Sequence, residues 1–125
     1  MPDLEALQTL GLHTDEGLAC CADDPEFYEE MLAEYADEAS ARIAQLQGQY
    51  DAADWKNYGI SAHSVKSTSR MIGALALSER AKELEFAAKA DDAETIRSLH
   101  APFLEEYALF AGQLQKLLAG TGGTP

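Results

Sequence analysis

The sequence predicts an all-α protein, an antiparallel four-helix bundle preceded by short N-terminal helical turns. Apolar residues recur at steps of three and four through four long segments, which is the spacing of a helix with one buried face. No segment shows the alternating pattern of a strand, and the connections between the periodic segments are short. Four amphipathic helices joined in this way are expected to pack as an antiparallel bundle.

The first two long helices are each marked by an aspartate at the start. Residues 3–22 are expected to form one or two short helical turns. Asp24 then precedes a proline at the first helical position, a combination that favours the start of a long helix. Asp54 is expected to cap the next helix, which runs to Gly73, a residue type suited to the left-handed conformation that ends helices.

The third and fourth helices are separated by Asp91 and Asp92, which interrupt the apolar pattern and cap the chain again. Pro102 lies inside the fourth segment and is expected to kink or divide it, because proline removes a backbone hydrogen bond. Residues 1–120 are expected to form a single domain and residues 121–125 a disordered tail. The aromatic residues on the stripes are expected in the core: Phe27, Tyr35, Trp55, Tyr58, Phe103, Tyr107 and Phe110.

The composition excludes several classes of partner. The 125 residues include 22 acidic and 9 basic side chains, a net charge of −13, and residues 1–41 contain no lysine or arginine. An acidic chain without a basic stripe argues against binding to nucleic acid or to anionic membranes. The adjacent Cys20 and Cys21 match no disulfide or metal-site spacing, and no apolar run is long enough to span a membrane. We therefore expect a cytoplasmic monomer.

His63 is the most informative residue, because it lies off the buried stripe of the second long helix. At about 100° per residue its side chain falls roughly 130° from the centre of that stripe and should face water. The neighbours predicted on the same outward arc are small or cationic: Lys56, Gly59, Lys66, Ser67 and Arg70. A reachable imidazole beside positive charge suits a nucleophile that accepts and releases an anionic group.

This segment resembles the motif of histidine-containing phosphotransfer (HPt) domains, which is a histidine, a lysine three residues later, then a glycine, with a second glycine at the helix end. The corresponding residues here are His63, Lys66, Ser67 and Gly73. Flanking segments also match: FYEEML at 27–32, DW at 54–55, LSERAKELE at 77–85 and HAPFLEEY at 100–107. The resemblance covers about residues 15–118 and departs from the family at Ser67, where many members have glycine.

The resemblance implies that His63 accepts a phosphoryl group from the aspartyl phosphate of one receiver domain and passes it to another. Lys66, and more loosely Arg70, would attract the phosphoryl oxygens. Glu85 stands where the phosphotransfer bundles of chemotaxis kinases carry a glutamate that holds the imidazole. The alternative for Glu85 is a solvated acid that pairs with Lys82 or Lys89.

The same resemblance implies partners but no cofactor of the chain's own. The expected partners are response-regulator receiver domains and a hybrid histidine kinase, and the Mg²⁺ and most catalytic groups belong to the receiver. Partner docking is expected at Lys56, Gly59, Ser67 and Gly73. The other histidines lie outside the motif, so His13 is expected to be exposed and His100 to have a local structural role.

Other functions are less compatible with the sequence. A nucleotide-using enzyme needs a glycine-rich phosphate loop, and a di-metal bundle needs Glu-x-x-His pairs; the chain contains neither. Two alternatives stay open: the phosphoacceptor domain of a chemotaxis-type histidine kinase, phosphorylated directly by an ATP-binding domain, and a degenerate scaffold bundle without phosphotransfer.

Overall fold

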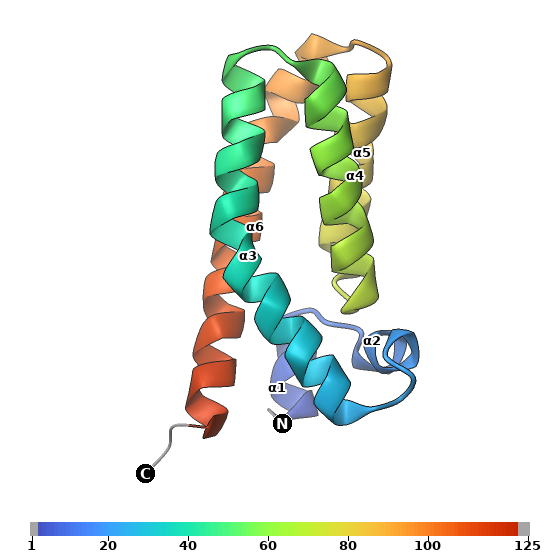
Figure 1. The fold of residues 1–125 in the computed structure, drawn as a ribbon, viewed down its shortest axis with the longest axis vertical. Helices are drawn as coiled ribbons and strands as arrows, with labels where there is room; N and C mark the ends of the chain where they lie inside the picture. Colours follow the sequence, from blue (N-terminus) through green and yellow to red (C-terminus); the bar gives the residue numbers. More distant parts are fainter. Residues whose placement is uncertain (1–2, 123–125) are drawn as a thin grey trace.

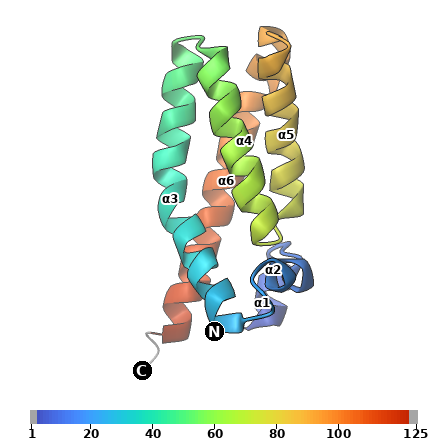
Figure 2. The same ribbon diagram turned by 45° about the vertical axis from the view of Figure 1, so that its right-hand side comes forward.

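The computed structural model describes residues 3–122, which form six helices and no strand (Figure 1). The helices are α1 (Leu4–Thr9), α2 (Thr14–Cys20), α3 (Pro25–Asp51), α4 (Trp55–Met71), α5 (Leu75–Lys89) and α6 (Ala93–Gly122). The four long helices α3–α6 run alongside one another, and the short α1 and α2 lie at one end (Figure 2). The predicted all-α bundle with additional N-terminal helices is confirmed.

The four long helices pack in the order in which they follow one another in the chain. Helix α3 packs against α4 and α6, and α5 packs against the same two helices. The α3–α4 and α5–α6 connections lie at one end of the bundle, and the α4–α5 connection lies at the other end, near α1 and α2 (Figures 1 and 2). This antiparallel arrangement sets α4 beside α5 along most of their length.

Aspartate caps start the long helices as the sequence predicts. The Oδ1 atom of Asp24 accepts a hydrogen bond from the Glu26 amide at 3.0 Å, and that of Asp54 accepts one from the Asn57 amide at 3.3 Å. Asp92 accepts one from the Thr95 amide at 3.1 Å ahead of α6. Each cap satisfies an amide that has no partner within its helix.

Gly73 ends α4 with a φ of +85°, the left-handed conformation that the sequence predicts for it. Its carbonyl accepts a hydrogen bond from the His13 amide at 2.9 Å, and a side chain at position 73 would collide with the His13 backbone. Gly73 is therefore buried beneath the segment that precedes α2. Its predicted place in the docking surface is wrong, because the N-terminal turns cover it.

Helix α6 continues through Pro102, so of the two predicted outcomes, a kink or a division, the division is wrong. Leu99, Phe103 and Tyr107 pack into the core on both sides of the proline, and this packing outweighs the loss of one backbone hydrogen bond. The helix extends to Gly122, beyond the predicted domain end, and residues 123–125 of the predicted tail lie outside the described residues. No helix within residues 3–122 has the length and apolar character to cross a bilayer.

The core contains five of the seven aromatic residues that the sequence assigns to it, and the two exceptions are Phe27 and Trp55. Phe27 is 41% exposed, whereas its neighbour Tyr28 is fully buried and donates a hydrogen bond from Oη to the Ile72 carbonyl at 2.8 Å. The first turn of α3 presents Tyr28 to the end of α4, which turns Phe27 outward. Trp55 is only partly buried, at the surface of the bundle.

His100 lies in the core of the bundle, where its imidazole joins three helices. Tyr58 Oη of α4 lies 2.8 Å from Nδ1, and Gln47 Oε1 of α3 lies 3.0 Å from Nε2. The ring stacks on Tyr50 with centroids 3.8 Å apart. The amide oxygen can only accept, so Nε2 donates, and in the neutral ring Nδ1 accepts from the tyrosine. The predicted structural role of His100 is confirmed.

Candidate functional site

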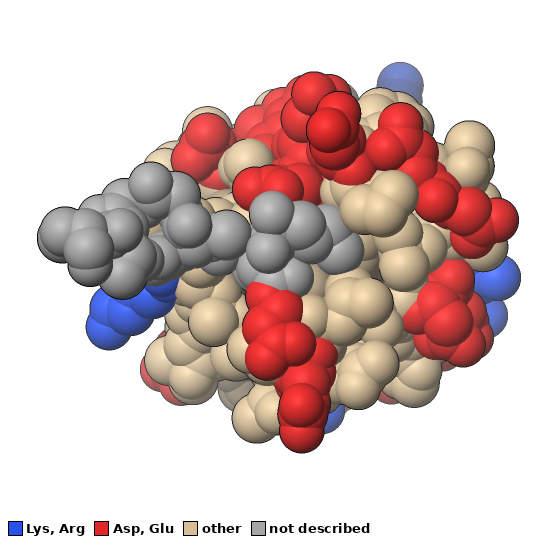
Figure 3. Space-filling model, turned by 90° about the horizontal axis from the view of Figure 1, so that it is seen from below, with Lys and Arg blue, Asp and Glu red and all other residues tan. Residues whose placement is uncertain are grey.

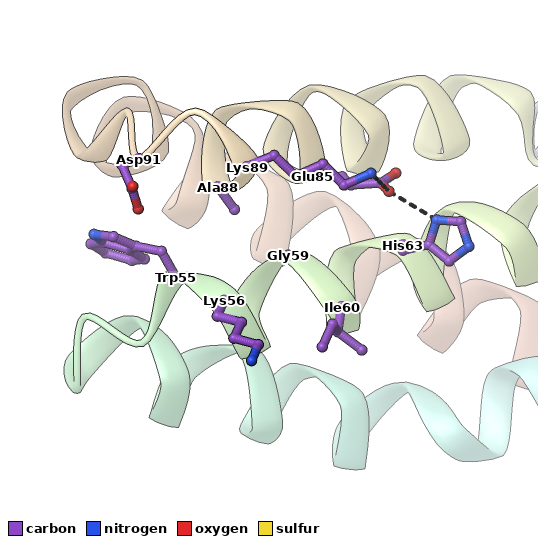
Figure 4. Close-up of a pocket in the computed structure, with 9 residues that line it drawn as sticks. All are labelled: Trp55, Lys56, Gly59, Ile60, His63, Glu85, Ala88, Lys89 and Asp91. Atoms are coloured by element: carbon purple, nitrogen blue, oxygen red, sulfur yellow. Dashed lines mark hydrogen bonds and ion pairs between the residues drawn. The ribbon is translucent and has the colours of Figure 1, made fainter.

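His63 occupies the middle of α4 and faces solvent, as the sequence predicts. Its side chain is 57% exposed, although α4 packs against α2, α3 and α5. Figure 4 shows the imidazole at one end of a groove between α4 and α5, beside Glu85. The ring is therefore accessible on one side and held by the protein on the other.

Glu85 on α5 is the residue that holds the ring. Its side chain is only 2% exposed, and its Oε2 lies 2.9 Å from His63 Nδ1. Lys66 Nζ lies 2.8 Å from Oε1, and Lys89 Nζ lies 2.9 Å from Oε2. We call His63, Lys66, Glu85 and Lys89 the carboxylate cluster. Glu85 thus contacts the imidazole and also Lys89, one of the two lysines of the alternative interpretation, but it is buried rather than solvated.

The electrostatics of the cluster determine which ring nitrogen of a neutral His63 carries the proton. Burial by itself raises the pKa of the Glu85 carboxyl, but the close contacts with Lys66, Lys89 and His63 outweigh it and lower that pKa to about 2. The carboxylate is therefore ionised at neutral pH and can only accept. In a neutral imidazole Nδ1 must then carry the proton, which leaves the lone pair on Nε2.

Close packing of α4 on α5 brings Glu85 within reach of the ring. A Cβ atom on Gly59 would lie 3.2 Å from Ala88 Cβ, so the two helices approach closely at this glycine. Ser78 Oγ donates a hydrogen bond to the Lys66 carbonyl at 2.9 Å and ties the helices together on the other side. Gly59 is buried, and its predicted outward position is wrong because α5 covers that edge of α4.

The groove beside His63 is apolar along its floor. It encloses about 530 Å³, with Gly59 and Ala88 between Trp55 at one end and His63 at the other (Figure 4). Ile60, on its rim, is 59% exposed. The sequence pattern predicts Trp55 in the core, and it gives no role to Ile60. The signal that could have identified Ile60 is its position as an isoleucine outside the buried stripe.

The other residues predicted for the site are only partly brought together. Lys56 is exposed and lines the groove, and Ser67 is exposed one turn after His63. Arg70 is exposed but lies seven residues beyond His63, about 10 Å along the helix axis, and it is not part of the carboxylate cluster. Lys82 lies over the Phe86 ring at 5.5 Å from its centroid instead of pairing with Glu85.

The comparisons with known proteins bear on this geometry. The family model of the Hpt domain matches residues 30–121, which include the whole carboxylate cluster. The chain belongs to the Hpt domain family. No curated protein and no solved structure matches this chain. Hpt domains are phosphotransfer intermediates in phosphorelays rather than catalytic kinases, and they interact with receiver domains and kinases.

Charge is unevenly distributed over this Hpt domain. The end formed by α1, α2 and the start of α3 carries many acidic side chains (Figure 3). The segment Trp55–Gly73, by contrast, has three basic residues and no acidic one: Lys56, Lys66 and Arg70. Within residues 3–122 no group of three or more His, Cys, Asp or Glu side chains is placed to hold a metal ion. The histidine therefore lies in a locally basic part of an acidic protein.

Proposed function

We propose that this Hpt domain accepts a phosphoryl group on Nε2 of His63 from the aspartyl phosphate of a receiver domain and passes it to a second receiver. The observation that carries the proposal is the hydrogen bond between His63 Nδ1 and the buried Glu85 carboxylate. This bond orients the ring and leaves the nucleophilic nitrogen free. An exposed imidazole fixed on one side only is suited to meeting a group that a partner presents.

The transfer step uses this arrangement directly. The Nε2 lone pair attacks phosphorus, the bond from phosphorus to the aspartyl oxygen breaks, and the aspartate leaves as a carboxylate with the electron pair. The Nδ1 proton stays in its hydrogen bond to Glu85, so the ring gains positive charge as the Nε2–P bond forms. The Glu85 carboxylate stabilises that charge where it develops. The return step to a second receiver reverses each change.

Lys66 supports the reaction from the same helix. It lies three residues after His63, so both side chains project from the same side of α4. Its ammonium group is positioned to offset the negative charge of the moving phosphoryl group. Arg70, farther along the helix, would contribute only when its long side chain extends toward the site.

Partner docking is proposed over the surface around His63. A receiver must bring its aspartate close to Nε2, and on one side the small Ser67 leaves the helix accessible. On the other side the groove presents Trp55 and Ile60, with Lys56 on its rim. An apolar groove next to a charged centre is suited to a contact that excludes water around the transfer.

The test is phosphorylation by receivers of the source organism. Each receiver domain is phosphorylated and incubated with the protein, and the product is analysed for acid-labile, alkali-stable phosphate. Label is expected on the wild type and on the matched control His13→Gln, and none on His63→Gln. Label that persists on His63→Gln contradicts the assignment of the acceptor. A wild type that neither a receiver nor phosphoramidate labels would indicate a scaffold bundle.

A second function, the phosphoacceptor domain of a chemotaxis-type histidine kinase, is favoured by one specific observation. Glu85 contacts the imidazole from the facing helix, as the resemblance to those kinase domains implies. The two functions differ in the phosphoryl donor. An ATP-binding kinase domain of this type, supplied with ATP, should label His63 directly in the second case, whereas in the first case it should not, and the protein donor should be a phosphorylated receiver.

A further inference from the structure

Lys66 has two anionic groups to neutralise during the proposed transfer, the Glu85 carboxylate and the phosphoryl group. Before transfer its ammonium group lies 2.8 Å from Oε1 of the buried Glu85. Once the phosphoryl group is on Nε2, the strongest negative charge near Lys66 is on the phosphoryl oxygens. Lys66 can move there only if Glu85 tolerates its departure, and a buried carboxylate that loses its cation is strongly destabilised.

Lys89 is placed to make that departure possible. Its ammonium group lies 2.9 Å from Oε2, the same oxygen that faces His63 Nδ1. Lys89 is four residues after Glu85 on α5, so the two side chains are neighbours on one helix face. Figure 4 shows the Lys89 side chain extended along α5 to the Glu85 carboxylate. Movement of Lys66, which is on α4, would leave this contact intact.

We infer that Lys89 is a positioning residue of the phosphotransfer site, which keeps Glu85 neutralised while Lys66 leaves the carboxylate for the phosphoryl group. The inference rests on the proposed function. Without Lys89, Lys66 is the remaining lysine on a buried carboxylate and is retained there. The moving phosphoryl group then lacks its cation, although Lys66 is still present.

The experiment measures the rate at which phosphoramidate labels His63, so that no receiver is needed. In this reaction the Nε2–P bond forms, the P–N bond of the N-protonated donor breaks, and ammonia leaves with the electron pair. Lys89→Gln should reduce the rate by about tenfold, and Lys89→Arg should restore it because the charge returns. Lys82→Gln is the matched control on the same helix and should keep the wild-type rate. Lys89→Met repeats the test with the aliphatic stem retained.

A double-mutant cycle distinguishes this role from a merely structural one. In a Glu85→Gln background the carboxylate charge is gone, so Lys89→Gln should reduce the rate by less than about twofold. An equal loss in both backgrounds would overturn the inference, because Lys89 would then act on the phosphoryl group directly. A wild-type rate in Lys89→Gln would also overturn it. If phosphoramidate does not label the wild type, the same variants are compared with a phosphorylated receiver as donor, and failure of both donors would mean that the proposed function itself fails.

Discussion

Two histidines of this bundle lie in different surroundings, and these surroundings suit the same side chain to different roles. His100 is buried, stacks on Tyr50 and has a partner on each ring nitrogen. His63 is more than half exposed and, among the described residues, has a partner on Nδ1 alone. A ring with both nitrogens hydrogen-bonded stabilises the fold, whereas a ring with one nitrogen bonded and the other exposed can react.

The difference lies in the neighbouring helix as much as in the histidine. His100 meets neutral partners, a phenol and an amide, so its environment stabilises the uncharged ring. His63 meets a carboxylate that two lysines keep ionised. A carboxylate stabilises positive charge on the ring, and such charge would develop in the proposed phosphoryl transfer. The comparison therefore predicts that stability and transfer depend on different residues.

The largest expected effect is on stability. His100→Ala removes a stacked ring and leaves Tyr58 and Gln47 without their shared partner, so we expect a loss of about 2–4 kcal/mol in the free energy of unfolding. His63→Ala, at an exposed position, should change it by less than about 0.5 kcal/mol. Urea unfolding measures both. Equal destabilisation of the two variants would contradict the comparison. Phosphoramidate labelling of folded His100→Ala should proceed at the wild-type rate.

The next effect concerns transfer. Lys66→Gln should slow phosphotransfer from a receiver by about tenfold, equivalent to about 1.4 kcal/mol, because the moving phosphoryl group loses its cation. Rapid-quench measurements of label on His63 give the rate. His13→Gln, far from the site, serves as the reference. An unchanged rate in Lys66→Gln would show that this lysine only neutralises Glu85.

Replacing Ser67 by Gln tests access to the ring from a partner. Glutamine favours helix and position 67 is exposed, so the melting temperature should stay within a few degrees of wild type. The added volume should obstruct a receiver that descends on this turn, because packed interfaces tolerate extra atoms poorly. Labelling by phosphoramidate should persist. If receiver transfer survives, the partner does not dock over this turn; if both donors fail, the substitution has damaged the site.

The smallest effect is a pH dependence of stability. Burial lowers the pKa of His100, only partly opposed by Asp51, so the folded state binds a proton less readily than the unfolded state. Stability should therefore fall as the pH drops below about 6.5, by up to about 1 kcal/mol at pH 5.5. His100→Phe, which keeps a stacking ring, should lack this component. Urea unfolding of both proteins at pH 7.5 and 5.5 measures the difference.

Glu85 affects the stability of the protein in a separate, lower pH range. Its pKa is about 2 in the folded protein and near 4.5 when unperturbed, so its contribution is present above pH 4.5 and is lost as the pH falls toward 2. The contributions of His100 and Glu85 to stability therefore fall in different pH ranges.

Much of this architecture could be predicted from spacing and caps. The long helices begin after Asp24 and Asp54 as expected, and His63 faces water because it lies off an apolar stripe that can be read directly. Phe27 and Gly59 were assigned wrongly because they lie at the edges of their stripes, where only the position of the neighbouring helix decides between core and surface. Tertiary packing carries that information, and a single periodic pattern does not.

The carboxylate cluster was likewise predictable only in part from the sequence. The position of Lys66 follows from its spacing to His63 on one helix. The contact of Glu85 with the ring depends on how α4 and α5 align, and a pattern within one helix does not contain that alignment. The resemblance to chemotaxis kinase domains pointed to this contact, but only the packed structure shows that Lys89 contacts the same carboxylate.

The acidic end of the molecule has a consequence for how the sequence can change over time. His63 lies eight residues before the end of α4, about 12 Å along the helix axis, and α1 and α2 lie beyond that end. At physiological salt a surface charge is largely screened beyond about 8 Å. Acidic residues there are electrically remote from the imidazole. Natural variation can therefore alter the charge of that end, and with it the solubility of the protein, without altering the chemistry on α4.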